Sequence, residues 1–277
     1  MLAGPANSSR YPAGVTEHER ELTGGNASGR VVRVGGTVRK PWTRTSAVSQ
    51  AYVEELRSRG VDAPQPLGRD ERGRAVLEYV DGPLAQDLMP LDDAGLHRVG
   101  AMVRAIHDAS EGIPIAHALG AEMLLPAEDA DLLCHNDLAP WNLVVGERWA
   151  FIDWDGAGPS TRLWDLAYAA QSFGMLVGGE SVDAAARRLR AFVDGYGADA
   201  SLRAALPAAM AKRTAAMFEL LRSSSETGFQ PWADMYRSGH GEHWRHAAAY
   251  VSAHEVQWAD ALLGPDADGG RDGHRRR

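Results

Sequence analysis

Cysteine is almost missing from this sequence: Cys134 is the only one among 277 residues. A single thiol cannot form a disulfide within the chain, and this composition favours a reducing, cytoplasmic setting. The sequence also has no apolar run of about 18 residues, which a membrane-spanning helix needs, and no basic-then-apolar start typical of a secretory signal. A cytoplasmic protein without a membrane partner is therefore expected.

Positive charge is also in short supply. The chain has 29 Lys and Arg residues against 37 Asp and Glu, which gives a formal net charge of −8 at pH 7. Nucleic acids and anionic membranes are bound by basic surfaces, so this balance argues against both as partners and mildly favours a small cationic one. The hydrophobic content of 44% is ordinary for a globular chain with a sizeable core.

The most informative stretch runs from 132 to 154. His135, Asp137 and Asn142 have the spacing H-x-D-x-x-x-x-N, and Asp153 follows a second apolar run. Two apolar runs that end in acidic or amide residues predict two short paired strands presenting oxygen ligands to one spot. Such a set is typical of phosphoryl transfer, with Asn142 and Asp153 holding Mg²⁺ and Asp137 accepting the proton of an attacking hydroxyl.

The sequence H-N-D-L-A-P-W-N at 135–142, followed by I-D-W-D at 152–155, resembles the aminoglycoside phosphotransferase family of small-molecule kinases. Protein kinases carry Phe-Gly after the metal-binding Asp. Here Trp-Asp follows instead, which favours the small-molecule branch. The segment L-W-D-L-A at 163–167 also resembles the part of that family that follows the metal site.

The resemblance implies a two-lobed, protein-kinase-like α+β fold. Residues 17–81 would form a small β-rich lobe that binds nucleotide, and residues 82–264 a larger, mostly helical lobe for catalysis and substrate binding. The ends, 1–16 and 265–277, are expected to be disordered. The implied activity is ATP-dependent transfer of the γ-phosphate to a hydroxyl of a small molecule, with ATP and Mg²⁺ as cofactors.

Three glycines, Gly24, Gly25 and Gly29, precede two Val-rich runs that read as a hairpin over 30–41. A glycine-rich loop of this kind lets backbone amides approach phosphates.

A strand predicted over 74–80 leads into Asp-Gly-Pro at 81–83, where the chain is expected to cross between the lobes. Adenine is expected to bond to backbone groups between Glu78 and Val80.

A cation on the second hairpin strand is expected to reach the α and β phosphates. The resemblance aligns Arg39 with the basic residue of the family, and Lys40 is the alternative, because strand alternation lets only one of them face inward. A helix predicted over 46–59 offers Glu54 and Glu55 as partners for this cation. Both lie nearer the helix end than the family pattern places the partner, so which of them pairs, if either, stays open.

The apolar spacing over 92–107 predicts a core helix of the second lobe. His107 at its end, and His135, are expected to be packed, hydrogen-bonded residues rather than catalytic ones. Further helices are predicted over 163–173, 182–196, 201–223 and 244–263.

Acidic and aromatic residues of the second lobe would suit a polyamine or amino sugar as acceptor. The candidates are Asp155, Glu219, Glu226, Trp232, Asp234, Glu242, Trp244 and Trp258. An aminoglycoside or another antibiotic, and hence a role in antibiotic resistance, is the favoured class; choline, a sugar or another metabolite is the alternative.

A catalytically silent nucleotide-binding protein with the same fold is the other class of function. Such proteins typically lose the base or a metal ligand, whereas Asp137, Asn142 and Asp153 are all present here. The sequence leaves open the acceptor, the preference for ATP or GTP, and the oligomeric state.

Overall fold

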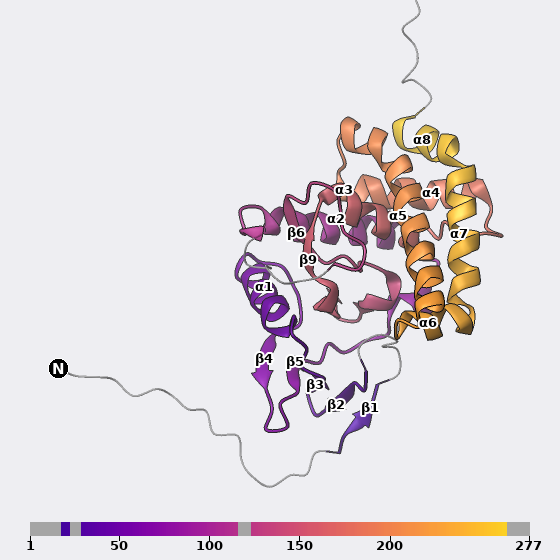
Figure 1. Cartoon of the computed structure of the whole chain (residues 1–277). Helices are drawn as coiled ribbons and strands as arrows, with labels where there is room; N and C mark the ends of the chain where they lie inside the picture. Colours follow the sequence, from indigo (N-terminus) through magenta and orange to yellow (C-terminus); the bar gives the residue numbers. More distant parts are fainter. Residues whose placement is uncertain (1–17, 23–28, 116–122, 265–277) are drawn as a thin grey trace, which may run out of the picture.

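The computed structural model describes residues 18–22, 29–115 and 123–264. The expected disordered ends, and Gly24 and Gly25 of the expected glycine loop, lie outside the described residues. Figure 1 shows a small sheet with helix α1 at one end of the chain and a larger helical part beyond it. No helix in the described ranges has the length and apolar content that a membrane crossing requires.

The first part is a five-stranded antiparallel sheet in the order β1-β2-β3-β5-β4. The β2–β3 hairpin turns at Gly35 and Gly36, which confirms the predicted hairpin. Strand β4 was not anticipated because two prolines interrupt its pattern; it lies at the sheet edge, where the missing amide proton of Pro66 is tolerated. The elements are β1 (Arg20–Glu21), β2 (Val32–Val34), β3 (Thr37–Lys40), α1 (Ser46–Ser58), β4 (Pro66–Arg69) and β5 (Ala75–Glu78).

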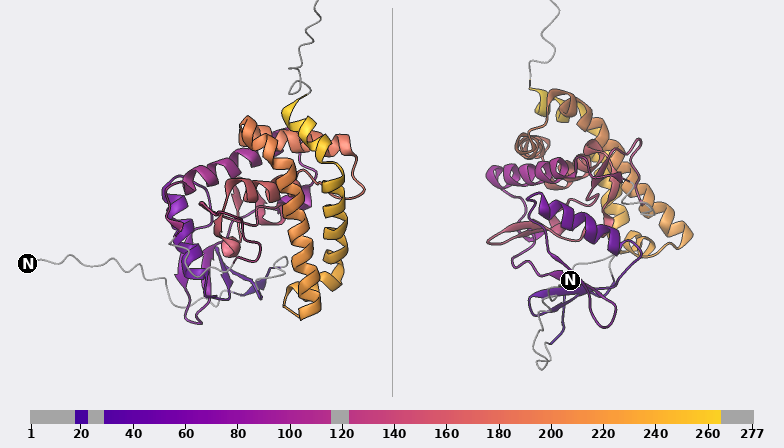
Figure 2. Two further views of the ribbon diagram at one scale, coloured as in Figure 1. Left: turned by 45° about the horizontal axis from the view of Figure 1, so that its top comes forward. Right: turned by 90° about the vertical axis from the view of Figure 1, so that its left-hand side faces the viewer.

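The second part holds two short hairpins and a set of helices. Strand β6 (Leu132–Cys134) pairs with β9 (Gly158–Ser160), and β7 (Leu143–Val145) pairs with β8 (Trp149–Phe151). Figure 2 shows the long helices α5 and α7 lying side by side. The helices are α2 (Asp93–Ser110), α3 (Arg162–Phe173), α4 (Val182–Tyr196), α5 (Ala200–Thr227), α6 (Trp232–Met235), α7 (Gly241–Ala253) and α8 (Glu255–Leu263).

The single helix predicted over 244–263 is wrong at His254, where α7 ends and α8 begins. His254 leaves the helical conformation, and its Nδ1 lies 2.8 Å from the Tyr250 carbonyl oxygen. The change of direction lets Trp258 become fully buried and donate its indole N–H to the carbonyl of Val251. Burial of a large aromatic side chain stabilises this break.

Helix α2 carries the apolar stripe expected from the sequence, with Leu96, Val99 and Val103 fully buried. It packs backbone to backbone against α4 at two glycines. A Cβ on Gly100 would lie 2.1 Å from the carbonyl oxygen of Phe192, so only glycine allows this approach. The close packing fixes the helical base on which the hairpins β6–β9 and β7–β8 rest.

The chain crosses between the two parts at Gly82, whose φ of +141° suits glycine alone. The crossing presses against the turn of the β7–β8 hairpin: a Cβ on Gly146 would lie 2.2 Å from the carbonyl oxygen of Asp81. Beyond this point, the amide of Val145 donates to the carbonyl of Pro83 at 2.9 Å. The linker is thus attached to the hairpin that carries the expected metal ligands at its base.

Candidate active site

The loop between β6 and β7 holds the H-x-D-x-x-x-x-N residues, and the β7–β8 pairing confirms the predicted paired strands. Asn142 donates through its Nδ2 to the backbone carbonyl of Asp137 at 3.0 Å and to the Asp137 carboxylate at 2.8 Å. Because its amide nitrogen is engaged in this way, the side-chain oxygen of Asn142 remains as an acceptor for a cation.

His135 is fully buried and structural, as predicted. Its Nδ1 accepts the backbone amide of Asp137 at 3.3 Å, so Nε2 carries the proton and donates to the carbonyl of Ile152 at 3.1 Å. The neutral imidazole therefore ties the catalytic loop to the residue before Asp153.

Asp153 adopts a left-handed conformation, φ 58° and ψ 64°, which non-glycine residues rarely occupy. Such backbone strain, roughly 1–3 kcal/mol, concentrates at functional sites. The conformation brings the carboxylate of Asp153 to 2.9 Å from Lys40 Nζ, and Asp155 lies 2.7 Å from the same nitrogen. A cation of the first part of the fold thus meets two carboxylates of the second.

Lys40, the alternative, occupies the position that was predicted for Arg39. Lys40 is 6% exposed and lines the cleft beside Val38. Arg39 points to the other face of β3, where its guanidinium contacts the Thr37 hydroxyl and lies 3.6 Å from Asp70. The choice of Arg39 is therefore corrected, and its physical reason is the alternation of side chains along the strand.

Neither glutamate of α1 meets Lys40. Glu55 pairs with Arg59 at 2.7 Å, and Glu54 is exposed. The helix turns Gln50 towards the cleft instead. The anionic partners of Lys40 are therefore Asp153 and Asp155, which departs from the pattern that the resemblance implies.

A cleft of about 260 Å³ lies between the sheet and the catalytic loop. Glu78 and Val80 line it, as expected for an adenine site, and Asn142 and Asp153 lie along its other side. The side chain of Glu78 turns to Arg148 at 2.9 Å and to the amide of Gln65, so its backbone is the part left to face a ligand.

The rest of the lining is largely apolar, which suits an aromatic base. The cleft residues are Leu22, Val31, Val38, Lys40, Ser46, Ser49, Gln50, Val53, Pro64, Pro66, Ala75, Leu77, Glu78, Tyr79, Val80, Gly82, Leu84, Trp141, Asn142, Val144, Ile152, Asp153, Trp154 and Asp155. Gly29, with a φ of +68°, packs near Pro41 outside this lining.

Burial and charge shift the protonation of the site. Burial raises the pKa of Asp137, and the nearby Asp153 charge adds to this, while His135, Tyr168 and Asn142 oppose it. Burial alone would lower the pKa of Lys40, but the two carboxylates raise it above its usual value. Lys40 therefore stays a cation in the cleft.

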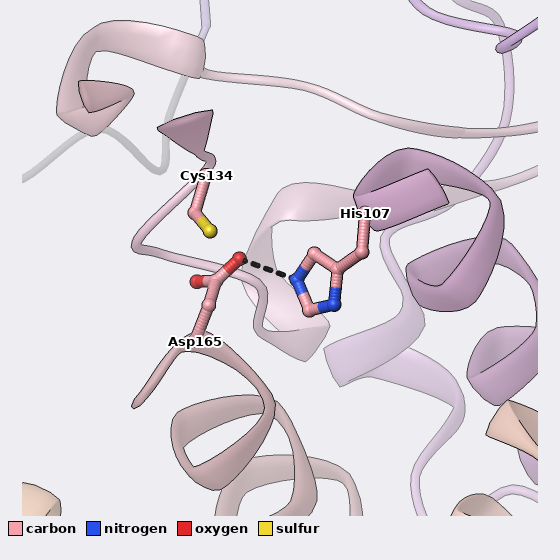
Figure 3. Close-up of side chains that lie close together, drawn as sticks. All are labelled: His107, Cys134 and Asp165. Carbon is pink, nitrogen blue, oxygen red and sulfur yellow. Dashed lines mark hydrogen bonds and ion pairs between the residues drawn. The ribbon is translucent and has the colours of Figure 1, made fainter. Parts of the chain in front are cut away.

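A fully buried cluster of His107, Cys134 and Asp165 lies beneath the loop (Figure 3), with potential ligand atoms within 4.8 Å of one another. It suits a metal ion poorly, because burial raises the pKa of the Cys134 thiol well above its usual value. Asp165 accepts from the backbone amide of Asn136 at 2.9 Å and lies 3.1 Å from His107 Nε2. The cluster supports the catalytic loop, and the structural role predicted for His107 is confirmed.

The residues suggested for a cationic acceptor are engaged elsewhere. Trp258 and Trp244 are buried, Trp232 is half-buried, and Asp155 bonds to Lys40. The exposed acids each have an arginine neighbour, namely Glu219 and Glu226 with Arg222, Asp234 with Arg237, and Glu242 with Arg245.

Comparison with known proteins supports the resemblance. Residues 114–206 match the model of the phosphotransferase enzyme family. The sequence matches no curated protein significantly.

Among solved structures, the chain resembles amicoumacin kinase hAmiN in complex with AMP-PNP, Ca²⁺ and Ami, with a TM-score of 0.62 and 14% identity, covering 90% of this chain and 89% of that one. It also resembles a choline/ethanolamine kinase family protein from Mesorhizobium loti, with a TM-score of 0.57 and 18% identity, covering 91% and 94%. The streptomycin–ATP–APH(2")-IIa ternary complex gives 0.50 and 13%, covering 85% and 93%.

These identities establish the fold, and the family match adds the catalytic segment. The family resemblance and the two-lobed kinase-like fold predicted from the sequence are thus confirmed: this chain has the fold of the small-molecule phosphotransferases and carries the sequence of the phosphotransferase enzyme family over residues 114–206.

Proposed function

We propose that this protein is an ATP- and Mg²⁺-dependent kinase that transfers the γ-phosphate to a hydroxyl of a small molecule. One observation carries the proposal: Lys40, Asn142 and Asp153 meet along one cleft with Asp137 hydrogen-bonded to Asn142 at its edge. This collects a phosphate-binding cation, two oxygen ligands and a base, which phosphoryl transfer requires.

The donor set fits a hard cation. The amide oxygen of Asn142 and the carboxylate of Asp153 are the ligand types that Mg²⁺ takes when it also binds phosphates, and Asp155 adds a carboxylate nearby. When bound, the metal would neutralise charge on the nucleotide phosphates. Lys40 moves from Asp153 and Asp155 towards those phosphates, and Asp137 orients the acceptor hydroxyl and receives its proton.

The acceptor is proposed to be an antibiotic or a small metabolite alcohol. An amicoumacin kinase and a choline/ethanolamine kinase family protein are both among the similar structures. Antibiotics stay the favoured class, because the first of these two gives the higher TM-score. The arginine partners of the exposed acids weaken the argument for a polycation in particular.

The test is ADP release with Mg²⁺ and ATP over a panel of aminoglycosides, other hydroxyl-bearing antibiotics, choline, ethanolamine, aminopropanol and sugars. Acceptor-dependent ADP release supports a kinase, and the active compound names its class. Stabilisation by Mg²⁺-ATP in a thermal shift assay without any turnover would support the silent nucleotide-binding alternative instead.

Lys40→Met is expected to lower kcat/KM for ATP by about 10²- to 10³-fold, because the cleft loses its phosphate-binding cation. Arg39→Met is the matched control: it removes the neighbouring basic residue on the other strand face, where surface ion pairs contribute only about 0–1 kcal/mol. Steady-state kinetics with varied ATP compare the two. Equal losses in both variants, or a larger loss in Arg39→Met, would contradict the assignment of Lys40.

A further inference from the structure

Tyr168 on α3 reaches the proposed base from below the catalytic loop. It is 3% exposed, and its hydroxyl is hydrogen-bonded to the Asp137 carboxylate. Burial raises the pKa of Tyr168 well above its usual value, so the hydroxyl keeps its proton and acts as the donor. Asp137 therefore has two side-chain donors, Tyr168 and Asn142.

Arg213 on α5 lies against the ring of Tyr168. Its guanidinium carbon is 4.3 Å from the ring centroid, and its Nη2 donates to the carbonyl of Asn136 at 3.3 Å. Arg213 therefore contacts both Tyr168 and the residue before the proposed base.

The placement of Arg213 is energetically unfavourable by itself. The side chain is 5% exposed, Nη1 has no hydrogen-bond partner among the described residues, and no carboxylate of those residues lies within ion-pair distance. Burying a guanidinium without an ion pair costs several kcal/mol. Charges of Asp137 and Asp165 nearby offset part of this cost. A buried cation beside the catalytic loop is expected where the loop needs a fixed shape or a nearby positive charge.

The ring of Tyr168 is held from other directions as well. It stacks on Trp244 of α7, with centroids 6.0 Å apart and planes 17° from parallel, and it meets the edge of Trp141 at 6.3 Å. A ring fixed by these contacts gives its hydroxyl one direction, which lies toward Asp137. The carboxylate is thus oriented from the helical lobe, independently of the nucleotide.

We propose that Tyr168 is a positioning residue for the proposed base, with Arg213 holding both the Tyr168 ring and the Asn136 carbonyl in place. This inference rests on the proposed kinase function and adds to it how Asp137 is aimed at the acceptor hydroxyl. A catalytic group must be held closely to its productive orientation, and hydrogen bonds from rigid neighbours provide this.

The test is a double-mutant cycle on ADP release with the most active alcohol of the panel. Tyr168→Phe keeps the ring and removes the hydroxyl, and we expect it to lower kcat by about 10- to 100-fold with little change in KM for ATP. In the Asp137→Asn background the same substitution is expected to cost almost nothing further, because Tyr168 acts through the carboxylate. Arg213→Lys is expected to show the same dependence on Asp137.

Tyr250→Phe is the matched control. Tyr250 is also buried and donates its hydroxyl to one acceptor, the carbonyl of Glu180 at 3.1 Å, in the helical lobe away from the loop. It is expected to keep the wild-type kcat. Equal fold losses for Tyr168→Phe in both backgrounds, or an unchanged kcat, would overturn the inference. Absence of turnover in the wild type over the whole panel would instead overturn the proposed function.

Discussion

Asp137→Asn is expected to lower kcat by about 10²- to 10⁴-fold, the usual contribution of a general base, and to leave the affinity for Mg²⁺-ATP nearly unchanged. The asparagine side chain has almost the same shape, and its oxygen can still accept from the Nδ2 of Asn142, which bonds to the carboxylate at 2.8 Å. The loss should therefore report the missing base and not a collapsed loop.

Two measurements separate these effects for Asp137→Asn. Steady-state kinetics with the active acceptor give kcat, and thermal-shift titration with Mg²⁺-ATP gives the nucleotide affinity. A near-wild-type kcat would show that Asp137 is not the base. A loss of nucleotide binding equal to the loss of turnover would mean that the residue acts on the nucleotide site instead.

Asp153→Ala is expected to abolish turnover and nucleotide-dependent stabilisation together, because metal and nucleotide bind as one unit. At a ligand concentration of 100 times Kd, binding stabilises the folded state by about 2.7 kcal/mol, and most of this should disappear. Lys40 keeps Asp155 as a partner at 2.7 Å, so the cleft retains one of its ion pairs. The measurement is the shift in melting temperature over a titration of Mg²⁺ and ATP.

Asp153→Asn is the control for backbone effects. Asparagine tolerates the left-handed conformation at φ 58° better than alanine does, so it removes the charge with less strain. We expect Asp153→Asn to lose nucleotide-dependent stabilisation too, although its amide oxygen makes the loss smaller. Unchanged Mg²⁺-ATP stabilisation and unchanged turnover in both variants would rule out Asp153 as a metal ligand.

Much of the candidate site could be predicted because it is local in sequence. Asn142 lies five residues after Asp137, and the two bond directly, as the motif spacing indicates. The short strands around them follow from apolar runs, and the left-handed residue Asp153 directly follows one of them. Local spacing determines these contacts, so one chain suffices to find them.

The choice between Lys40 and Arg39 could not be made in the same way. It depends on which face of β3 looks into the cleft, and that is set by pairing with β5, where Lys40 lies opposite Ala75. One signal was present: Lys40 and Lys212 are the only lysines of the chain, so a lysine at this position stands out among the arginines.

Tyr168 and Arg213 carried no signal of their own. They lie on separate helices, 45 residues apart, and meet Asp137 only through the packing of α3 and α5 under the loop. An aromatic residue and an arginine at helical spacing are most often core and surface residues. Tertiary packing, which no periodicity reveals, is what gives them a place near the base.

The attachment of the linker to the β7–β8 hairpin limits how the cleft can open. From Pro83 onward the chain is bonded to Val145, and Asp81 and Gly146 touch through their backbones, so this part of the linker moves with the catalytic lobe. Rotation of the sheet lobe therefore has its axis at Val80 and Asp81, directly beside the expected adenine site. A nucleotide seated there lies at the centre of the movement, where displacement is smallest, while Lys40 at the far end of the cleft sweeps through the largest arc.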